Sequence, residues 1–294
     1  MHKFFYGLLQ LMRPMEWSKS FGNMAIAAIT AGIFLHAGLD PVRFAWGFAS
    51  VALLWSGLYA LNDYTDRKAD AMHPVKKNRA IPSGKVSAKT ALAFSILLIF
   101  ISLSISWLID GTGLFTICIL AMLANQIMYT MPPFSLKKRP VVDLISGSLV
   151  NPIFRFYAGW VLFVPAFNAP ISVLLFILGV QFGGFGLYRM ASKKHEKKIG
   201  LKSSVVLFGE KNMKRLAYAA LAIGALSYVY ACLTVLPIVY LFWGLAMILA
   251  LPLYKTALKN PQKINMNKMY WLTYIQYLVF IAGFIVLYWL QIGM

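Results

Sequence analysis

Three of the nine acidic residues of this 294-residue chain lie close together near its first quarter. Asp63, Asp66 and Asp70 are spaced by three and four residues, which places them on one face of a helix, and Asn62 precedes them. Such like charges repel one another unless a cation lies among them. Carboxylate and amide oxygens suit Mg²⁺ that bridges to phosphate oxygens. The spacing predicts that these four residues bind Mg²⁺ and act in catalysis; the alternative is a solvated, charged helix end.

A basic stretch follows the acidic residues. Lys76, Lys77 and Arg79 come soon after Asp70, and residues 82–84 form a Pro-Ser-Gly turn. A diphosphate can then be held from two sides, by metal on one face and by guanidinium or ammonium groups on the other. We therefore predict that Lys76 and Arg79 bind phosphate groups of a substrate.

The elements that must position these residues are membrane-spanning helices. Hydrophobic residues make up 60% of the chain and charged residues 13%, whereas a soluble domain carries about 25% charged residues. A transmembrane helix takes about 20 residues. Apolar runs of that length occur at 21–38, 44–62, 90–109, 112–130, 141–163, 170–188, 216–233, 236–254 and 270–291. The predicted fold class is an all-α integral membrane protein with nine transmembrane helices.

The charge distribution sets the predicted orientation. The chain has 28 Lys and Arg residues against 9 Asp and Glu residues, a net charge of +19. Such an excess suggests nucleic acid in a soluble protein, but in a membrane chain it marks cytoplasmic loops. With the N-terminus in the cytoplasm, every Lys and Arg except Arg43 and Arg155 falls on that side. We expect a prokaryotic inner or cell membrane, a site at the cytoplasmic face, and no nucleic acid partner.

The chain is predicted to form one domain over residues 1–294. Residues 1–20 hold a short apolar stretch that Arg13 interrupts, and because no small-residue cleavage site follows, an interfacial segment is preferred to a signal peptide. Residues 63–89 and 189–215 are predicted cytoplasmic loops that cap the site.

An internal repeat is also indicated. Three pairs of identical residues are each separated by 125 positions: Gly84 and Gly209, Lys89 and Lys214, and Tyr129 and Tyr254. The members of each pair occupy similar places in the pattern of loops and helices. This spacing predicts two similar four-helix halves with a ninth helix appended.

The acidic stretch and the residues after it resemble the first signature of the UbiA superfamily of intramembrane prenyltransferases. That signature reads NDxxDxxxD and is followed by basic residues and a Pro-Ser-Gly-like turn. Asn62, Asp63, Asp66, Asp70 and Arg79 match it position by position. The resemblance implies a Mg²⁺-dependent site for a diphosphate at these residues.

Two further segments are similar to family segments in the correct order. Residues 13–19 read Arg-Pro-Met-Glu-Trp-Ser-Lys and resemble an opening RPxxW-type segment. Residues 129–137 read Tyr-Thr-Met-Pro-Pro-Phe-Ser-Leu-Lys and resemble the segment after the fourth helix. The resemblance implies that Lys19, Tyr129 and Lys137 bind substrate, although Tyr129 could instead be an interfacial tyrosine.

The second signature of the family is altered in this chain. The family usually carries a second acidic stretch after the sixth helix, read roughly as NDxxDxxxDxxxGxKT. Gly200 and Lys202 keep the frame, so Arg189 and Ser192 stand in place of the first two carboxylates and Glu196 in place of the third. A second Mg²⁺ bound in the usual way is therefore not expected.

Two interpretations of this change remain open. Arg189 and Lys193 could neutralise phosphate charge directly, as a metal does elsewhere. They could instead be positive-inside residues beside a site that has lost activity. The first interpretation predicts substrate contacts at Arg189, Ser192, Lys193, Glu196 and Lys202.

Arg155 lies in the middle of the predicted helix 141–163. A charge at that depth costs about 2.5 kcal/mol or more on insertion scales, so the side chain should face a polar cavity. It could bind ligand there, or it could form a purely structural pair.

The resemblance implies a transferase that moves an isoprenyl group from an isoprenyl diphosphate to a lipophilic acceptor. The alternative is a polyprenyl-phosphate phosphoribosyltransferase that uses phosphoribosyl diphosphate, because that branch shares the first signature and lacks the second. A third possibility, from another class, is a non-catalytic lipid-binding homologue. Mg²⁺ is the expected cofactor, membrane lipids surround the chain, and no obligate protein partner is evident.

Overall fold

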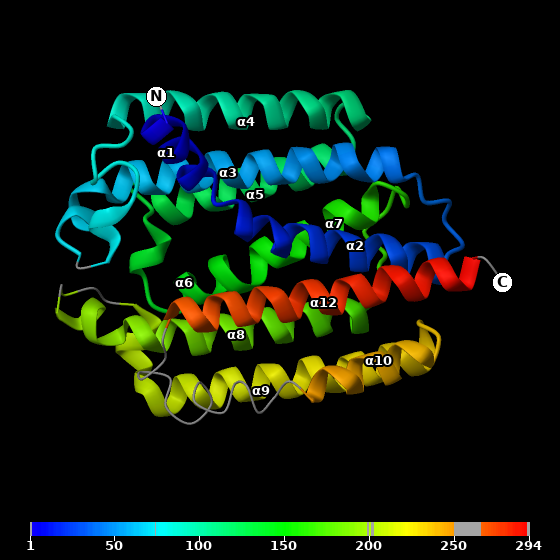
Figure 1. Cartoon of the computed structure of the whole chain (residues 1–294). Helices are drawn as coiled ribbons and strands as arrows, with labels where there is room; N and C mark the ends of the chain where they lie inside the picture. The colour runs from blue at the N-terminus through cyan, green and yellow to red at the C-terminus, as the bar shows by residue number, and fades with distance from the viewer. Residues whose placement is uncertain (1, 74, 199, 201–202, 250–265, 293–294) are drawn as a thin grey trace.

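The computed structural model describes residues 2–73, 75–198, 200, 203–249 and 266–292. Within these residues the chain forms helices and no strand, which confirms the prediction of an all-α protein. The long helices run side by side in one bundle (Figure 1). Apolar side chains pack between them, and the largest buried cluster includes Met24, Trp55, Phe156 and Trp160.

The first part of the chain forms the helices α1 (His2–Met12), α2 (Trp17–Phe34), α3 (Pro41–Ala71), α4 (Ala88–Asp110) and α5 (Leu114–Thr130), with short 3₁₀ turns η1 (Pro14–Glu16) and η2 (Lys76–Asn78). Two of these helices begin at side-chain caps. The carboxylate of Asp40 accepts from the backbone N–H of Val42 at 2.8 Å, and Ser87 Oγ accepts from the N–H of Thr90 at 3.1 Å. Each cap satisfies a backbone donor that has no partner inside the helix.

The second part forms η3 (Leu136–Lys138), α6 (Val142–Ile145), the π-helical turn η4 (Ser146–Val150), α7 (Asn151–Val161), α8 (Ile171–Lys198), α9 (Ser204–Thr234), α10 (Val239–Ile248) and α12 (Met266–Ile292). The predicted helix 141–163 is therefore present as α6, η4 and α7, which follow one another without a gap. One of its turns, η4, is π-helical. Gly159 lets α7 approach α2 closely, since a Cβ atom there would lie 2.3 Å from the carbonyl oxygen of Met24.

Several helices are suited to a bilayer. Among the described residues, α3, α4, α9 and the stretch Trp271–Gln291 of α12 are long and apolar enough to cross a membrane. Two shorter apolar helices occur at Leu114–Thr130 and Ile171–Leu187. The chain is an integral membrane protein; the count of nine spans stays a prediction.

Helix α1 has two different faces. Gly7 and Leu11 are buried, whereas Phe4, Phe5 and Leu9 are exposed. Exposed aromatic and aliphatic side chains on one face of a short helix suit the membrane interface. Within the predicted interfacial segment 1–20, α1 ends at Met12, η1 follows it, and α2 begins at Trp17.

The two predicted loops are shorter than expected. Helix α3 continues to Ala71, α8 continues to Lys198, and α9 already begins at Ser204. The three acidic residues therefore lie on the last turns of α3, not in a loop. The connection from α3 to α4, the end of α8 and the short α6 all lie at one end of the bundle (Figure 1).

Gly84 and Gly209, which the 125-residue spacing pairs, share an unusual backbone conformation. Both have φ of +72°, a region where a residue with a Cβ atom is strained. Gly84 lies just before α4, and Gly209 forms a kink near the start of α9. The same spacing thus marks a positive φ at both positions.

Candidate active site

The acidic residues of α3 are held by basic residues from two other segments. Arg13 Nη2 lies 2.5 Å from Asp63 Oδ1, and Arg79 Nη1 lies 3.0 Å from the same oxygen. Arg79 Nη1 also lies 2.7 Å from Asp70 Oδ2. Asp63 and Asp70 are both only 3% exposed, so their charges are largely desolvated and depend on these partners.

Lys76 lies at the edge of this cluster. Its Nζ is 3.9 Å from Asp70 Oδ1. Burial and the nearby Arg79 guanidinium lower the pKa of Lys76 below its ordinary value. Burial is the larger cause, and the carboxylates of Asp70 and Asp66 oppose the shift.

The segment after α5 reaches the same place. Lys137 Nζ lies 2.6 Å from Asp66 Oδ1 and donates to Asn62 Oδ1 at 3.2 Å. The hydroxyl of Thr130 also donates to Asn62 Oδ1, at 3.2 Å. Residues that are about 70 positions apart thus meet at one carboxylate and one amide.

The oxygen atoms of this cluster suit Mg²⁺. Asp63 and Asp66 use only Oδ1 for their ion pairs, and Oδ2 of each makes no hydrogen bond or ion pair with a described residue. Mg²⁺ is commonly bound through one or two carboxylates together with substrate phosphates and water. Among the described residues no three acidic, His or Cys side chains converge, so such a site would use this carboxylate pair and the phosphates.

A second charged cluster lies at the end of α8. Arg189 Nη2 is 3.2 Å from Asp143 Oδ2 and 3.1 Å from Glu196 Oε2. The hydroxyl of Ser203 donates to Glu196, and the hydroxyl of Ser204 donates to Asp143, whose Oδ2 also accepts from the Ser204 N–H at 3.2 Å. Arg189 thus occupies the position between two buried carboxylates where a metal ion could otherwise lie.

Tyr129 lies near the end of α5, within electrostatic range of both clusters. The charges of Asp66 in the first cluster and of Arg189 in the second both act on its hydroxyl. Its ring faces η4, since Cε2 would lie 4.0 Å from a Cβ atom on Gly147.

Arg155 lies deeper in the bundle. Its side chain is 5% exposed, and its guanidinium carbon lies 3.8 Å from the centre of the Trp55 ring. Arg155 therefore has an aromatic ring as a close neighbour. Its burial agrees with the expectation that this charge faces the interior of the bundle.

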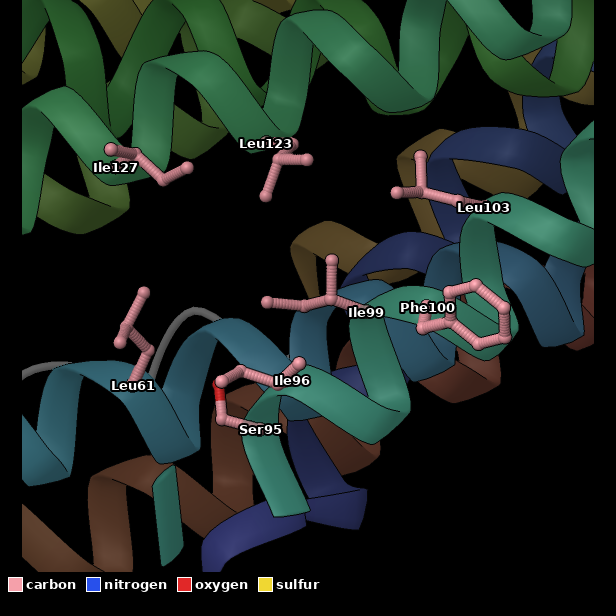
Figure 2. A pocket seen from close by; sticks show the side chains of 8 residues that line it. All are labelled: Leu61, Ser95, Ile96, Ile99, Phe100, Leu103, Leu123 and Ile127. Carbon is pink, nitrogen blue, oxygen red and sulfur yellow. The ribbon is translucent and has the colours of Figure 1, made fainter. Parts of the chain in front are cut away.

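An apolar groove lies between α3, α4 and α5. It has a volume of about 370 Å³, and its lining residues are Leu61, Ser95, Ile96, Ile99, Phe100, Leu103, Leu123 and Ile127 (Figure 2). Ser95 brings a hydroxyl to the lining, and that hydroxyl already donates to the carbonyl of Gly57 at 2.7 Å. The groove can accept an alkyl chain but offers nothing to a phosphate.

The sequence pattern of the UbiA prenyltransferase family matches residues 25–275. The chain belongs to the UbiA prenyltransferase family. Its acidic cluster on α3, its basic connection and most of its helices lie inside the matched region.

Curated relatives of this UbiA family member include two enzymes with different names. The decaprenyl-phosphate phosphoribosyltransferase of Mycolicibacterium smegmatis is 32% identical over 194 residues, which cover 64% of this chain and 56% of the relative. The digeranylgeranylglyceryl phosphate synthase of Methanothrix thermoacetophila is 28% identical over 167 residues, which cover 57% of this chain and 59% of the relative. The chain thus matches less than two thirds of the length of either relative.

A solved structure has the same fold. The UbiA homologue from Archaeoglobus fulgidus bound to GPP and Mg²⁺ superposes with a TM-score of 0.76 at 22% identity, over 95% of this chain and 98% of that one. At this level of identity the likeness establishes the fold of this UbiA family member.

The site predictions have mixed outcomes. The structure brings together Asn62, Asp63, Asp66, Asp70, Lys76, Arg79 and Lys137 in the first cluster, and Arg189 and Glu196 in the second. Lys19 instead pairs with Glu16 at 2.7 Å and lies over the Tyr274 ring. Lys193 is half-buried near Gly209. Lys202 and the side chain of Ser192 lie outside the described part of the chain.

Sequence reasoning missed three kinds of partner in this UbiA family member. Arg13 was part of a recognised segment but was not predicted to contact Asp63, which is 50 positions away. Asp143 and Ser204 were not predicted at all, and their contact spans 61 positions. Thr130 lay beside the predicted Tyr129 and gave no separate signal.

Proposed function

We propose that the chain is a membrane-embedded, Mg²⁺-dependent prenyltransferase that moves an isoprenyl group from an isoprenyl diphosphate to a lipophilic acceptor. The observation that carries this proposal is the meeting of Arg13 and Arg79 on one oxygen of buried Asp63. A carboxylate that can bind a cation is then in direct contact with guanidinium groups that can bind phosphate. The ligands named for the archaeal homologue, GPP and Mg²⁺, agree with this chemistry.

Each residue of the first cluster has a role that follows from its contacts. Asp63 and Asp66 would hold Mg²⁺ through their Oδ2 atoms, with Asn62 and Asp70 beside them. Bound Mg²⁺ would neutralise negative charge on the diphosphate as it leaves. Arg79, Lys76 and Arg13 would donate to phosphate oxygens when the diphosphate shares the carboxylates with them.

Lys137 and Tyr129 would act on the opposite side of the diphosphate. Lys137 is held by Oδ1 of Asn62 and Oδ1 of Asp66, so its ammonium group lies beside one of the proposed metal-binding carboxylates. The apolar bundle below keeps water away from the allylic carbon, which prevents hydrolysis of the reactive group. An electron-rich acceptor then attacks that carbon, the diphosphate carries away the bonding electron pair, and the acceptor atom loses its proton to the diphosphate or to solvent.

The second cluster would supply a fixed cation. Arg189 is charged at any physiological pH, and its contacts with Asp143 and Glu196 hold it in place. Arg189, with Ser192, Lys193, Glu196 and Lys202 nearby in sequence, would therefore orient the diphosphate without a second Mg²⁺.

We also propose the membrane arrangement predicted from the sequence, with nine spans in two similar four-helix halves and a ninth helix. The N-terminus and the end of the bundle that carries both clusters would face the cytoplasm. The excess of basic residues in the connections at this end supports that orientation.

A second candidate donor is phosphoribosyl diphosphate, with a polyprenyl phosphate as acceptor. Two observations favour it: Arg189 replaces a carboxylate of the usual second signature, and the relative at 32% identity is named decaprenyl-phosphate phosphoribosyltransferase. Asp63 and Asp66 would then bind the soluble diphosphate through Mg²⁺, and the lipid phosphate would use basic residues.

A single experiment separates these functions. The purified chain in proteoliposomes is given Mg²⁺, a lipid extract as acceptor source, and either radiolabelled geranyl diphosphate or radiolabelled phosphoribosyl diphosphate. Labelled lipid from the first donor supports prenyl transfer, and labelled lipid from the second supports phosphoribosyl transfer. No labelled lipid from either donor would support a non-catalytic lipid-binding protein and would overturn both proposals.

A further inference from the structure

Arg155 lies well below the two charged clusters. It follows Asp143 by twelve residues along α6, η4 and α7, which corresponds to roughly 18 Å of helix. On the neighbouring helix α3, Trp55 precedes Asp63 by eight residues, or roughly 12 Å. Because the guanidinium stacks on Trp55 at 3.8 Å, Arg155 lies about two helical turns below the carboxylate that would bind Mg²⁺.

The charge of Arg155 has no anionic partner in the described part of the protein. None of the ion pairs among described residues includes it, and its buried Nε atom has no hydrogen-bond partner. Its neighbours are Trp55 and the hydroxyl-bearing rings of Tyr59 and Tyr277. Aromatic faces and hydroxyls attract a cation, but they do not neutralise it. A buried charge of this kind needs a counter-charge.

The surroundings of Arg155 include polar side chains. Asn23 Oδ1 accepts from the hydroxyl of Tyr277 at 2.9 Å and from the side chain of Gln181. Asn23 is fully buried. Side chains from α2, α8 and α12 thus place hydrogen-bonding groups at the depth of Arg155, as expected for a site that receives a polar group.

The position also bears on the reaction. In prenyl transfer the reacting carbon develops positive charge as the diphosphate leaves, so a nearby guanidinium would oppose the reaction unless negative charge accompanies it. A negatively charged acceptor resolves this conflict. It would neutralise Arg155 and bring an electron-rich atom to the reacting carbon.

We propose that Arg155 binds an anionic oxygen group, a phosphate or a carboxylate, on the acceptor substrate. This inference rests on the proposed transferase function but not on which diphosphate is the donor. Arg155 is then a specificity-determining residue: it selects an amphipathic acceptor with a negative charge over its neutral counterpart.

The test compares charged and neutral probes of matched shape. Calorimetric binding to the full-length protein in detergent, with EDTA present so that Asp63 and Asp66 carry no metal, is measured for farnesyl phosphate against farnesol and for 4-hydroxybenzoate against 4-hydroxybenzyl alcohol. We expect the charged member of at least one pair to bind tenfold or more tightly, the ratio expected for a charge-assisted hydrogen bond. The pair that shows the preference identifies phosphate or carboxylate as the group.

The variants separate Arg155 from the other basic residues. Arg155→Gln should abolish the preference and Arg155→Lys should keep part of it. Arg43→Gln, which alters an arginine that only donates to the carbonyl of Leu162 at 2.8 Å, should leave it unchanged. Equal affinity for charged and neutral probes in the wild-type protein, or a preference that survives in Arg155→Gln, would overturn the inference.

A parallel measurement distinguishes this result from failure of the proposed function. Mg²⁺-dependent binding of geranyl thiodiphosphate, a slowly reacting donor analogue, should be lost in Asp63→Asn and kept in Arg155→Gln. Equal affinity of the wild-type protein for charged and neutral probes, with donor binding intact, contradicts the inference alone, whereas absence of donor binding with the charge preference intact contradicts the proposed function alone. Retained donor binding also shows that Arg155→Gln is folded.

Discussion

Nη2 of Arg189 lies 3.2 Å from Oδ2 of Asp143, and this ion pair joins the start of α6 to the end of α8. In the first part of the chain, Arg13 before α2 pairs with Asp63 near the end of α3. The two pairs connect similar places, but the signs of the charges are exchanged. The end of α8 therefore presents a cation where the end of α3 presents a carboxylate.

The first prediction concerns the acidic residues of α3. Asp63→Ala and Asp66→Ala should each reduce turnover by about two orders of magnitude or more, because several kcal/mol of charge stabilisation disappear. Transfer of radiolabel from the active donor to lipid, measured at saturating Mg²⁺, checks this. Asp40→Asn is the matched control, since asparagine also caps a helix and Asp40 lies at the other end of α3. A near-normal rate in Asp63→Ala would contradict the assignment.

The second prediction concerns orientation. Met72, in the connection that carries the basic residues, is 82% exposed, and Gly38 lies in open space at the other end of α3. An impermeant thiol reagent on intact cells should label Gly38→Cys and should label Met72→Cys only after permeabilisation. Both native cysteines are buried, so the background should be low. The reverse labelling pattern would refute a cytoplasmic site.

The third prediction concerns Arg189 and phosphate. If Arg189 orients the diphosphate, Arg189→Ala should raise the apparent KM for the donor about tenfold or more, since loss of a charged hydrogen bond costs roughly 1.5 to 3 kcal/mol. Arg189→Asp with Ser192→Asp would restore the usual family pattern and should make activity depend more steeply on Mg²⁺. Unchanged constants in Arg189→Ala would limit Arg189 to a structural role and move phosphate binding to Arg79 and Lys202.

The fourth prediction concerns stability at the same residue. Asp143 and Glu196 contact the same Nη2 atom of Arg189, so Arg189→Ala leaves two buried carboxylates facing one space. The variant should lose roughly 3 to 5 kcal/mol of stability, the usual cost of breaking a buried ion pair. Mg²⁺ should raise its unfolding temperature more than that of the wild-type protein, because the vacated position can now bind a cation. An equal Mg²⁺ effect in both proteins would speak against this account, and Arg43→Ala serves as the control.

The local part of the site was predictable from the sequence. Asp63, Asp66 and Asp70 lie on one helix, and their spacing alone places them on one face. Arg79 and Lys137 were predicted through recognised segments. The apolar run that predicts this helix ends at residue 62, but ion pairs with Arg13, Arg79 and Lys137 satisfy the acidic residues and let α3 continue to Ala71.

The part of the site that was not predictable depends on contacts between segments that are distant in the sequence. Arg13 and Asp63 meet because the segment before α2 packs against α3. No local sequence pattern indicates which basic residue of the opening segment faces Asp63. Lys19, two turns further along, pairs with Glu16 instead. Asp143 was not predicted, because its partner, Arg189, lies 46 positions away on another helix.

The π-helical turn η4 lies between Asp143 and Arg155. A π-helical turn holds about one more residue than an α-helical turn, and each residue of an α-helix is rotated by about 100° from the one before it. The wider turn absorbs its extra residue locally, so the side chains of α7 keep the directions that they would have in a regular helix one residue shorter. Removal of a single residue from 146–150 would restore that regular helix and leave the guanidinium of Arg155 on Trp55. The length of this connection can therefore change by one residue without moving the positive charge inside the bundle.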